Sequence, residues 1–414
     1  MAGLTAAQVV HALSDAAERW CNADFPPRVR ATRAVMERTG YTEPVVDFAL
    51  DTLFGGLTRA ALLQTIVGEL GSQAALDGFV ARPGRGDVHF RGVDRATIIS
   101  SDTTIGVAIP PLAYALCANV GRIVIKDRSD GLVLAFAKTI AEERPELGRR
   151  VRIEHWTEHD APEALEALAA SDVVVAFGGD AALASIRARL RPEARFVPYG
   201  HRTSVAYVSR NLLAAAAFAR GAAFDLACDA LLYDGDGCLS LHAIFVERGG
   251  ELNPRVFDAL LGDALDAAAV EFPAAAAEPA PDTARFARAA RFRAGLGNGI
   301  VRGGQTQAHV LAADLPLDQP PPLFPRALAT YAVDGPHDVT GFLRRHALPL
   351  EAFALDELCF DGTQRPELTA LALASGAVRL ARFGRLQAPS LAAEHGGTPR
   401  ILPFVRAVVR DGAE

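Results

Sequence analysis

The sequence predicts an α/β protein in which parallel-rich sheets follow a helical N-terminal region. Three observations lead to this class. Apolar residues recur at helical spacing up to about residue 80. From about residue 97, short β-branched runs alternate with helical stretches. The predicted strands are apolar along their whole length, as in parallel sheets that are covered on both faces.

The N-terminal region, residues 1–90, is expected to be helical. Its clearest segments are Ala6–Ala17, Pro27–Thr39 and Thr58–Leu70. Thr5 and Thr58 stand where an N-cap is needed, because a threonine oxygen can accept a hydrogen bond from the first helical turn.

The alternation of strand and helix occupies the next expected domain, residues 91–205. Its predicted strands cover residues 96–99, 122–126, 150–153 and 172–177, and its predicted helices 110–120, 131–143, 163–170 and 181–190. No G-x-G-x-x-G pattern follows the first strand, so a dinucleotide would bind without the usual fingerprint.

The glycine-rich positions of this domain come later, at Gly178-Gly179 ahead of Asp180 and at Gly200. A glycine turn that opens a helix can hold a phosphate at the helix N-terminus. Taken alone, the motif favours the alternative, an ordinary strand-to-helix turn.

A third expected domain, residues 206–370, centres on the stretch Asp234–Ser240. The helix predicted over 212–228 precedes it, and the apolar run Ala243–Val246 predicts a buried strand after it. Beyond lie a linker over 272–281 and a helix over 283–293. Two apolar loops around 267–277 and 348–358 are candidates for an acyl-binding tunnel or for ordinary packing.

Cys238 is the most informative residue of that stretch. The glycines before it permit a tight turn that brings backbone N–H groups close to the sulfur. A cysteine presented in this way can act as a nucleophile beside an oxyanion site. The alternative is a small buried hydrophobic residue, which is the usual role of a free cysteine.

Composition excludes several classes of function. The 414 residues carry a net charge of −7, which argues against nucleic acid as a partner. Five scattered cysteines without a C-x-x-C pair predict neither a disulfide framework nor a metal site. No signal peptide and no apolar run of membrane-spanning length is visible, so a cytoplasmic protein is expected.

Lysine is rare in this chain. Only Lys126 and Lys138 occur, and every other basic side chain except histidine is arginine. A retained lysine indicates a position that favours a compact ammonium group over a planar guanidinium.

Four segments together resemble the acyl-CoA reductase family. These enzymes are the long-chain acyl-thioester reductases of bacterial bioluminescence systems and their relatives, within the aldehyde dehydrogenase superfamily. The segments are Ala115–Ser129, with Ile125-Lys126 ending a strand; Phe177–Ala181; Tyr199–Val205; and Cys238–Ser240 followed by Ile244–Glu247. Their order and spacing match the family over most of the chain.

The resemblance implies an aldehyde-dehydrogenase-like architecture with two Rossmann-like α/β domains. Residues 91–205 would bind NADPH, residues 206–370 would supply the catalytic cysteine, and residues 371–414 would complete the cofactor domain or an oligomer interface. The implied cofactor-binding residues are Lys126, Ser129, Gly178, Gly179, Asp180, Gly200 and His201. Lys126 would meet the adenosine ribose or its 2′-phosphate.

The implied reaction is the reduction of an acyl thioester to an aldehyde through an acyl group on Cys238. Where hydrolytic relatives carry a glutamate in a Glu-Leu-Gly-Gly motif, this chain has Gly200-His201-Arg202-Thr203, without a carboxylate. Thr103 or Thr104, in a turn where the family has an asparagine, would donate to the oxyanion. His242 would assist proton transfer, or would simply be a packed histidine.

The implied substrate is an acyl-CoA or an acyl-protein thioester, with an acyl-protein synthetase or a carrier protein as a partner. A homo-oligomer is expected, as is usual in the superfamily. Three alternatives remain at this point: an acyl-phosphate reductase that makes a semialdehyde, a catalytically silent partner subunit, and an acyl carrier that uses Cys238 without a nicotinamide cofactor.

Overall fold

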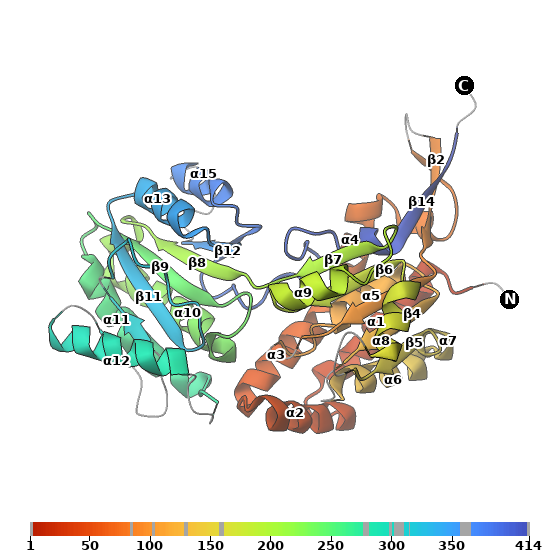
Figure 1. Cartoon of the computed structure of the whole chain (residues 1–414), viewed down its shortest axis with the longest axis horizontal. Coiled ribbons are helices and arrows are strands. Elements are labelled where there is room, and N and C mark those ends of the chain that lie inside the picture. Colours follow the sequence, from red (N-terminus) through yellow and green to blue (C-terminus); the bar gives the residue numbers. More distant parts are fainter. Residues whose placement is uncertain are drawn as a thin grey trace. The chain divides into compact units, whose positions relative to one another are not determined.

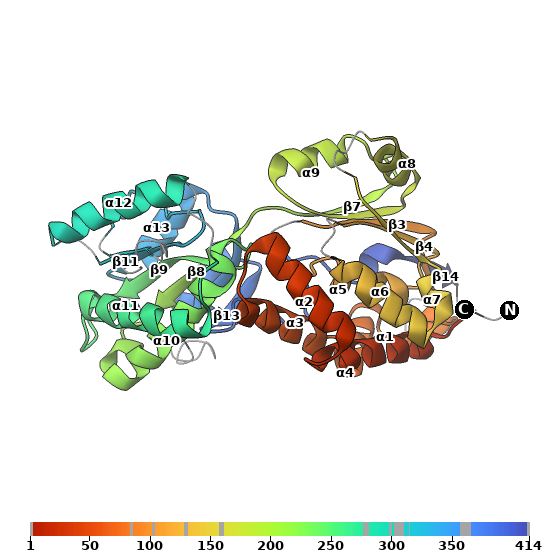
Figure 2. The same cartoon turned by 90° about the horizontal axis from the view of Figure 1, so that it is seen from below.

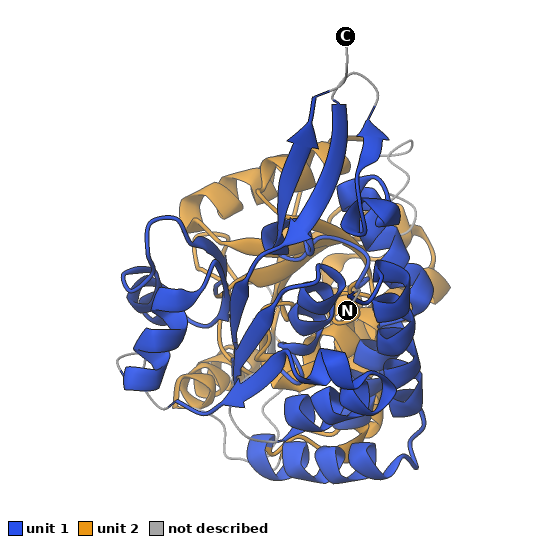
Figure 3. Cartoon of the chain, turned by 90° about the vertical axis from the view of Figure 1, so that its right-hand side faces the viewer, with its two compact units in different colours: residues 1–39, 46–200, 390–414 blue, residues 40–45, 201–389 orange. Residues whose placement is uncertain are grey.

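The computed structural model describes residues 3–82, 86–101, 104–127, 131–156, 161–275, 281–297, 300–301, 310–313, 315–356 and 366–411. The chain divides into two compact units (Figures 1 and 3). Unit 1 comprises residues 1–39, 46–200 and 390–414, and unit 2 comprises residues 40–45 and 201–389. Each unit contains its own parallel sheet.

The N-terminal region is helical, as predicted. Its helices are α1 (Ala6–Cys21), α2 (Pro26–Thr39), α3 (Glu43–Gly56), α4 (Arg59–Leu70) and the short 3-10 helix η1 (Gln73–Leu76). Both predicted N-caps are confirmed: the Thr5 hydroxyl accepts from the Gln8 N–H at 3.3 Å, and the Thr58 hydroxyl from the Ala61 N–H at 3.1 Å.

Three strands next to this region were not predicted. β1 (Val80–Arg82), β2 (Gly86–Gly92) and β14 (Val405–Arg410) form an antiparallel sheet in the order β1-β2-β14. β1 and most of β2 lie inside residues 1–90, which were expected to be helical. Their side chains alternate only weakly between buried and exposed, and β14 comes from the far end of the chain, so no local pattern indicates the pairing.

The large sheet of unit 1 has five parallel strands. They are β3 (Arg95–Ile99), β4 (Arg122–Lys126), β5 (Val151–Glu154), β6 (Val173–Phe177) and β7 (Arg195–Tyr199), in the order β5-β4-β3-β6-β7. The helices α5 (Ile109–Cys117), α6 (Leu132–Glu143) and the short α7 (Pro145–Gly148) lie on one side, and α8 (Pro162–Ala170) and α9 (Asp180–Arg187) lie on the other (Figure 2). Every strand and helix predicted between 96 and 190 is confirmed to within a few residues.

The sheet of unit 2 has six parallel strands. They are β8 (Thr203–Val208), β9 (Leu241–Glu247), β10 (Val310–Ala312), β11 (Ala327–Val333), β12 (Leu350–Leu355) and β13 (Arg379–Arg382), in the order β10-β11-β9-β8-β12-β13. Its helical elements are η2 (Leu212–Ala214), α10 (Ala216–Leu231), η3 (Leu232–Gly235), α11 (Pro254–Glu271), α12 (Pro281–Gly295), α13 (Pro336–His346) and α15 (Pro366–Ala374).

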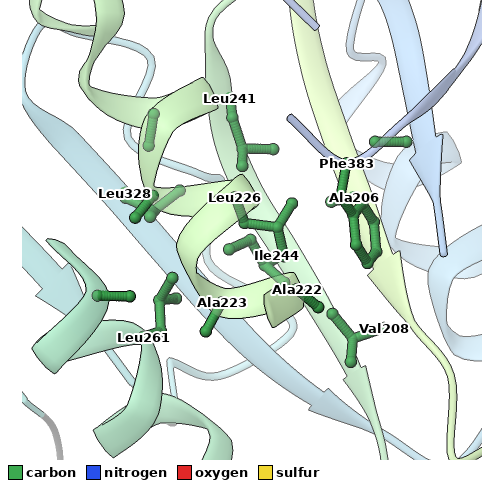
Figure 4. Packing of buried hydrophobic residues seen from close by; sticks show 14 of the residues in the cluster. Ala206, Val208, Ala222, Ala223, Leu226, Leu241, Ile244, Leu261, Leu328 and Phe383 are labelled. Atoms are coloured by element: carbon green, nitrogen blue, oxygen red, sulfur yellow. The ribbon is translucent and has the colours of Figure 1, made fainter. Parts of the chain in front are cut away.

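Helices cover both faces of this sheet, which explains why its strands are uniformly apolar. Ala206 and Val208 of β8 pack into one core with Leu226 of α10 and Leu261 of α11 (Figure 4). Val205 and Tyr207, the alternate residues of β8, belong to the core on the opposite face, which holds residues of α12, α13 and α15. Successive side chains of a strand point to opposite faces, so one strand serves both cores.

The expected apolar loops at 267–277 and 348–358 are only partly loops among the described residues. Residues up to Glu271 belong to α11, and Leu350–Leu355 is strand β12, buried at every position. The apolar character of Leu350–Leu355 therefore reflects core packing, whereas Val270 of α11 is exposed. No helix of the described chain has the length and apolar character that crossing a membrane requires.

Candidate active site

The predicted cofactor residues of unit 1 gather at the carboxyl edge of its sheet. Lys126 is the last residue of β4 and pairs in register with Ile99, the last residue of β3. Gly178 follows directly after β6, which neighbours β3 on its other side. The chain leaves β3 towards β4 and leaves β6 towards β7, so the strand order reverses between β3 and β6. Open α/β sheets bind their ligands at such a switch point.

The glycine turn after β6 leads directly into α9. Gly179 is the N-cap residue of this helix and has no side chain to satisfy the first N–H groups. The Gly178 N–H donates to the Tyr199 carbonyl at 3.1 Å, which ties the turn to β7. A Cβ atom at Gly200 would lie 3.3 Å from Oδ1 of Asp180, so this carboxylate lies against Gly200. Four predicted cofactor residues are thus neighbours in space.

An aromatic group at the same edge was missed by the sequence analysis. The rings of Phe177 and Tyr199, at the ends of β6 and β7, stack with their centroids 4.8 Å apart. The His395 ring stands edge-on to Tyr199 at 4.4 Å. His395 belongs to residues 390–414 of unit 1, and only folding brings it here.

Lys126 is itself almost fully buried, with 3% of its surface exposed. Ser129 and Thr103 lie outside the described residues. His201 belongs to unit 2, unlike the other cofactor residues predicted from sequence.

Cys238 of unit 2 follows a strained segment of backbone. Tyr233, Asp234 and Gly235 have φ values of 56°, 54° and 70°, in the left-handed region that non-glycine residues rarely occupy. Buried contacts hold the segment in place: Asp234 Oδ2 lies 3.1 Å from Arg326 Nη2, and that same nitrogen donates to the Ala275 carbonyl at 2.7 Å. Backbone strain of this kind persists where the surroundings over-determine it, and it is concentrated at functional sites.

The turn that contains Cys238 is closed by two hydrogen bonds. The Ser240 N–H donates to the Gly237 carbonyl at 2.9 Å, and the Gly237 N–H donates to Ser240 Oγ at 2.8 Å. Within the described part of the chain, no oxygen accepts from the two N–H groups between them, those of Cys238 and Leu239. The Cys238 N–H acts on its own sulfur and lowers the pKa of the thiol. Backbone N–H groups without an oxygen acceptor are the kind of donor that an oxyanion site uses.

The thiol of Cys238 is neutral in its resting surroundings. Burial raises its pKa to about 11, and the negative charge of Glu351 acts in the same direction. The guanidinium groups of Arg379 and Arg202 act in the opposite direction. Arg202 Nε also lies 3.6 Å from Glu351 Oε2, so the carboxylate is ion-paired.

Glu351 is a carboxylate near Cys238 that the comparison of segment 200–203 with the Glu-Leu-Gly-Gly motif did not reveal. Segment 200–203 lacks a carboxylate, but β12 supplies one from elsewhere in the chain. In the sequence, the feature that could have indicated it is that Glu351 is the single charged residue in the apolar run Leu350–Leu355. The surroundings of Cys238 are therefore not free of carboxylates.

A pocket of about 250 Å³ opens beside the cysteine turn. Its wall is formed by His201, Arg202, Thr203, Gly235, Asp236, Gly237, His242, Leu323, Phe324 and Pro349. His201 lies close enough to Asp236 to act on it electrostatically. Burial raises the pKa of the Asp236 carboxyl, and the interaction with His201 acts in the opposite direction. The pocket thus combines polar groups with an apolar wall, as ligand-binding sites do.

His242 contributes a neutral imidazole to this pocket. It is 6% exposed, and burial lowers its pKa below the ordinary value, against the effect of the Ala327 and Pro322 carbonyl groups. Its Nδ1 atom has no hydrogen-bond partner among the described residues. This nitrogen is buried, and a neutral ring with an unpaired nitrogen can accept a proton.

The described residues contain no group of three or more His, Cys, Asp or Glu side chains arranged to hold a metal ion.

Comparison with known proteins identifies the family to which this chain belongs. The family model of Acyl-CoA reductase (LuxC) matches residues 1–407. The chain belongs to the acyl-CoA reductase family. It is therefore an enzyme of the oxidoreductase type, and membership supports the aldehyde-forming reduction of an acyl group.

Similar solved structures show that this chain has the aldehyde dehydrogenase fold. The oxidoreductase from Marinobacter aquaeolei matches with a TM-score of 0.72 at 14% identity, over 98% of this chain and 86% of that one. The NAD-dependent benzaldehyde dehydrogenase from Corynebacterium glutamicum matches with 0.68 at 13% identity, over 99% and 87%. The NADP-dependent glyceraldehyde-3-phosphate dehydrogenase from Bacillus halodurans C-125 matches with 0.62 at 12% identity, over 97% and 90%. A search of curated proteins found no match.

Proposed function

We propose that this acyl-CoA reductase reduces an acyl thioester to an aldehyde with NADPH, through an acyl group carried on Cys238. The observation that carries the proposal is the Gly237–Ser240 turn, in which a thiol lies beside two unused backbone N–H groups. Family membership supports the choice of an acyl thioester as substrate.

The first step is attack of the Cys238 sulfur on the thioester carbon. Because the pKa of the thiol is about 11, a base must remove its proton at neutral pH. The candidate is His242, which lines the pocket and whose buried Nδ1 has no partner among the described residues. A bond forms between the sulfur and the acyl carbon, and the N–H groups of Cys238 and Leu239 stabilise the oxyanion. The bond to the substrate thiol then breaks, and the departing thiolate takes up the proton. Thr103 is a further proposed oxyanion donor.

The residues at the carboxyl edge of the unit 1 sheet fit a dinucleotide. NADPH, when bound, supplies the hydride that converts the acyl thioester to the aldehyde level. The uncapped first turn of α9 offers N–H groups to a phosphate, and Gly178 and Gly179 let the backbone approach it. The Asp180 carboxylate suits a ribose hydroxyl rather than a phosphate. Lys126, with Ser129 after it, is proposed to bind the adenosine ribose and its 2′-phosphate.

Water must be kept from the acyl-cysteine, because hydrolysis would give an acid instead of an aldehyde. Glu351 is the carboxylate that acts on Cys238, and its ion pair with Arg202 opposes a role as a general base. The ion pair therefore favours reduction over hydrolysis.

We further propose unit 1 as the cofactor domain and unit 2 as the catalytic domain. The acyl donor is coenzyme A, a carrier protein or an acylated synthetase partner. The enzyme is proposed to work in the cytoplasm as a homo-oligomer.

The direct test is NADPH oxidation at 340 nm with a panel of acyl-CoAs, for the wild type and for Cys238→Ala. We expect oxidation and aldehyde formation that disappear with the sulfur, because no covalent intermediate can form without it. Cys228→Ala, which removes another partly buried cysteine of unit 2, is the matched control and should retain activity. Oxidation that persists in Cys238→Ala would refute the covalent route. Cofactor binding without oxidation would point to a protein-bound acyl donor or a silent subunit.

The role of Lys126 is tested by cofactor-dependent stability. A ligand that binds only the folded state raises the melting temperature, and at a fixed concentration the rise is larger for the tighter ligand. We expect NADPH to raise the melting temperature of the wild type more than NADH does, and Lys126→Met to abolish that preference. Lys138→Met is the control, since Lys138 lies in α6. An unchanged preference in Lys126→Met would remove this lysine from the cofactor site.

A further inference from the structure

A buried hydrogen-bond network reaches the cysteine turn from a segment far along the chain. Gln387 is 5% exposed, and its Nε2 donates to Ser240 Oγ at 3.3 Å and to the backbone carbonyl of Asp229 at 3.2 Å. Ser240 Oγ is the same atom that accepts from the Gly237 N–H. The oxygen that closes the cysteine turn is therefore also held by a residue beyond β13.

The segment that carries Gln387 is itself fixed by α10. The carboxylate of Asp229, 1% exposed, accepts the Gly384 N–H at 2.8 Å on Oδ2 and the Leu386 N–H at 3.0 Å on Oδ1. Gly384 has φ of +71°, and a Cβ there would lie 3.2 Å from Asp225 Oδ1. One buried carboxylate thus sets the path of residues 384–387 and the place of the Gln387 amide.

We propose that Gln387, anchored by Asp229, is a positioning residue for the nucleophile and acts through Ser240 Oγ. This inference rests on the proposed role of Cys238. Ser240 Oγ can rotate about its χ1 angle, and only in the observed rotamer does it accept from Gly237. The Gln387 amide selects that rotamer. The turn then keeps the N–H groups of Cys238 and Leu239 in one arrangement.

The network acts on the cysteine turn through specific hydrogen bonds, and not through apolar packing. Its donors and acceptors are side chains and backbone groups of Asp229, Gly237, Ser240 and Gln387, of which all but the half-buried Gly237 are shielded from water. A buried polar network of this kind stabilises one conformation of the turn, because a polar group that lost its partner there would be desolvated without a compensating hydrogen bond.

The test is a double-mutant cycle on the reactivity of Cys238. Iodoacetamide alkylation of Cys238 is followed by peptide mass spectrometry from pH 7 to pH 11 in the wild type, Gln387→Met, Ser240→Ala and the double variant. The reagent needs neither acyl-CoA nor NADPH, so the result is independent of whether the proposed reaction takes place. Gln387→Met keeps the side-chain volume and removes both hydrogen bonds. If it does not fold, Gln387→Asn withdraws the amide by one methylene group instead.

We expect each single variant to slow alkylation about tenfold and to shift its pH profile to higher pH, because displaced N–H groups stabilise the thiolate less. The double variant should be no slower than the slower single variant. In the reductase assay, kcat should fall with little change in the KM for NADPH. Thr330→Val, a buried change on β11, should leave the pH profile unchanged. An unchanged profile in Gln387→Met, or effects that add in the double variant, would overturn the proposal.

Discussion

Cys238 is a nucleophile candidate whose charge state is set by its neighbours. Burial and Glu351 raise the pKa of its thiol, while Arg379 and Arg202 lower it. The balance leaves a neutral thiol, so reactivity depends on deprotonation in place. This differs from cysteines that lie among positive charges and are ionised at rest.

Removing the negative charge of Glu351 tests this balance. In Glu351→Gln the pKa of Cys238 should fall, because a carboxylate near a thiolate disfavours the charged form. At pH 8, alkylation of Cys238 should become about three- to tenfold faster, since each unit of pKa changes the thiolate fraction about tenfold in this range. The measurement is the alkylation rate against pH by peptide mass spectrometry.

Glu247→Gln is the matched control for that experiment. Glu247 is a fully buried carboxylate that is ion-paired to Arg210, and it lies at the opposite end of β9 from the cysteine turn. Its loss should leave the alkylation profile of Cys238 in place. Slower or unchanged alkylation in Glu351→Gln would contradict the assigned electrostatics.

At the scale of elements, the two units use opposite edges of their sheets. In unit 1 the candidate residues follow the carboxyl ends of β4, β6 and β7. In unit 2 they stand at the amino ends: Arg202 just before β8, Gly237 before β9 and Pro349 before β12. These three strands are neighbours in the order β9-β8-β12, so the amino ends of the strands bring the pocket wall together.

Among the described glycines of unit 1, Gly92 at the end of β2 makes the closest approach to other atoms, at the turn after α5. A Cβ at Gly92 would lie 2.2 Å from the Ala118 carbonyl oxygen and 2.6 Å from the Asn119 carbonyl carbon, both of them backbone atoms. Gly92→Ala should therefore push the small antiparallel sheet away and destabilise the protein by about 1–3 kcal/mol or more. Urea denaturation measures the loss.

Gly78→Ala supplies the comparison for that variant. Nothing lies within 4 Å of a Cβ at Gly78, which precedes β1. Its unfolding midpoint should stay close to the wild type, since an unstrained alanine restricts the unfolded chain. Equal midpoints for the two variants would contradict the close approach at Gly92.

At the scale of the whole molecule, the buried Asp229 makes stability depend on pH. Burial raises the pKa of its carboxyl to about 7 in the folded protein, against the backbone N–H groups that lower it. The folded state therefore holds this proton more tightly than the unfolded chain does. The stabilisation is fully present below the unfolded pKa and is lost as the pH rises towards about 7.

Comparison with Asp229→Asn isolates this contribution. Between pH 5 and pH 7, the free energy of unfolding of the wild type should decline with pH relative to the variant, by at most about 1.4 kcal/mol per pH unit. Chemical denaturation at a series of pH values measures the difference, and all other titrating groups cancel in it. Parallel pH curves would show that Asp229 keeps its ordinary pKa.

The sequence by itself determined much of the fold. The continuous apolar strands and the alternating helices of residues 96–190 are local patterns, and Thr5 and Thr58 cap helices through neighbouring residues. The glycines around Cys238 marked a turn for the same reason, because backbone freedom is a property of single residues.

Only the tertiary structure decided what surrounds Cys238. Glu351, Arg379 and Gln387 come from segments more than a hundred residues away along the chain, and strand order brings the first two near the sulfur. The pairing of β2 with β14 and the place of His395 beside Tyr199 arise in the same way. Contacts between distant segments leave no periodic trace in either segment, so a single sequence cannot reveal them.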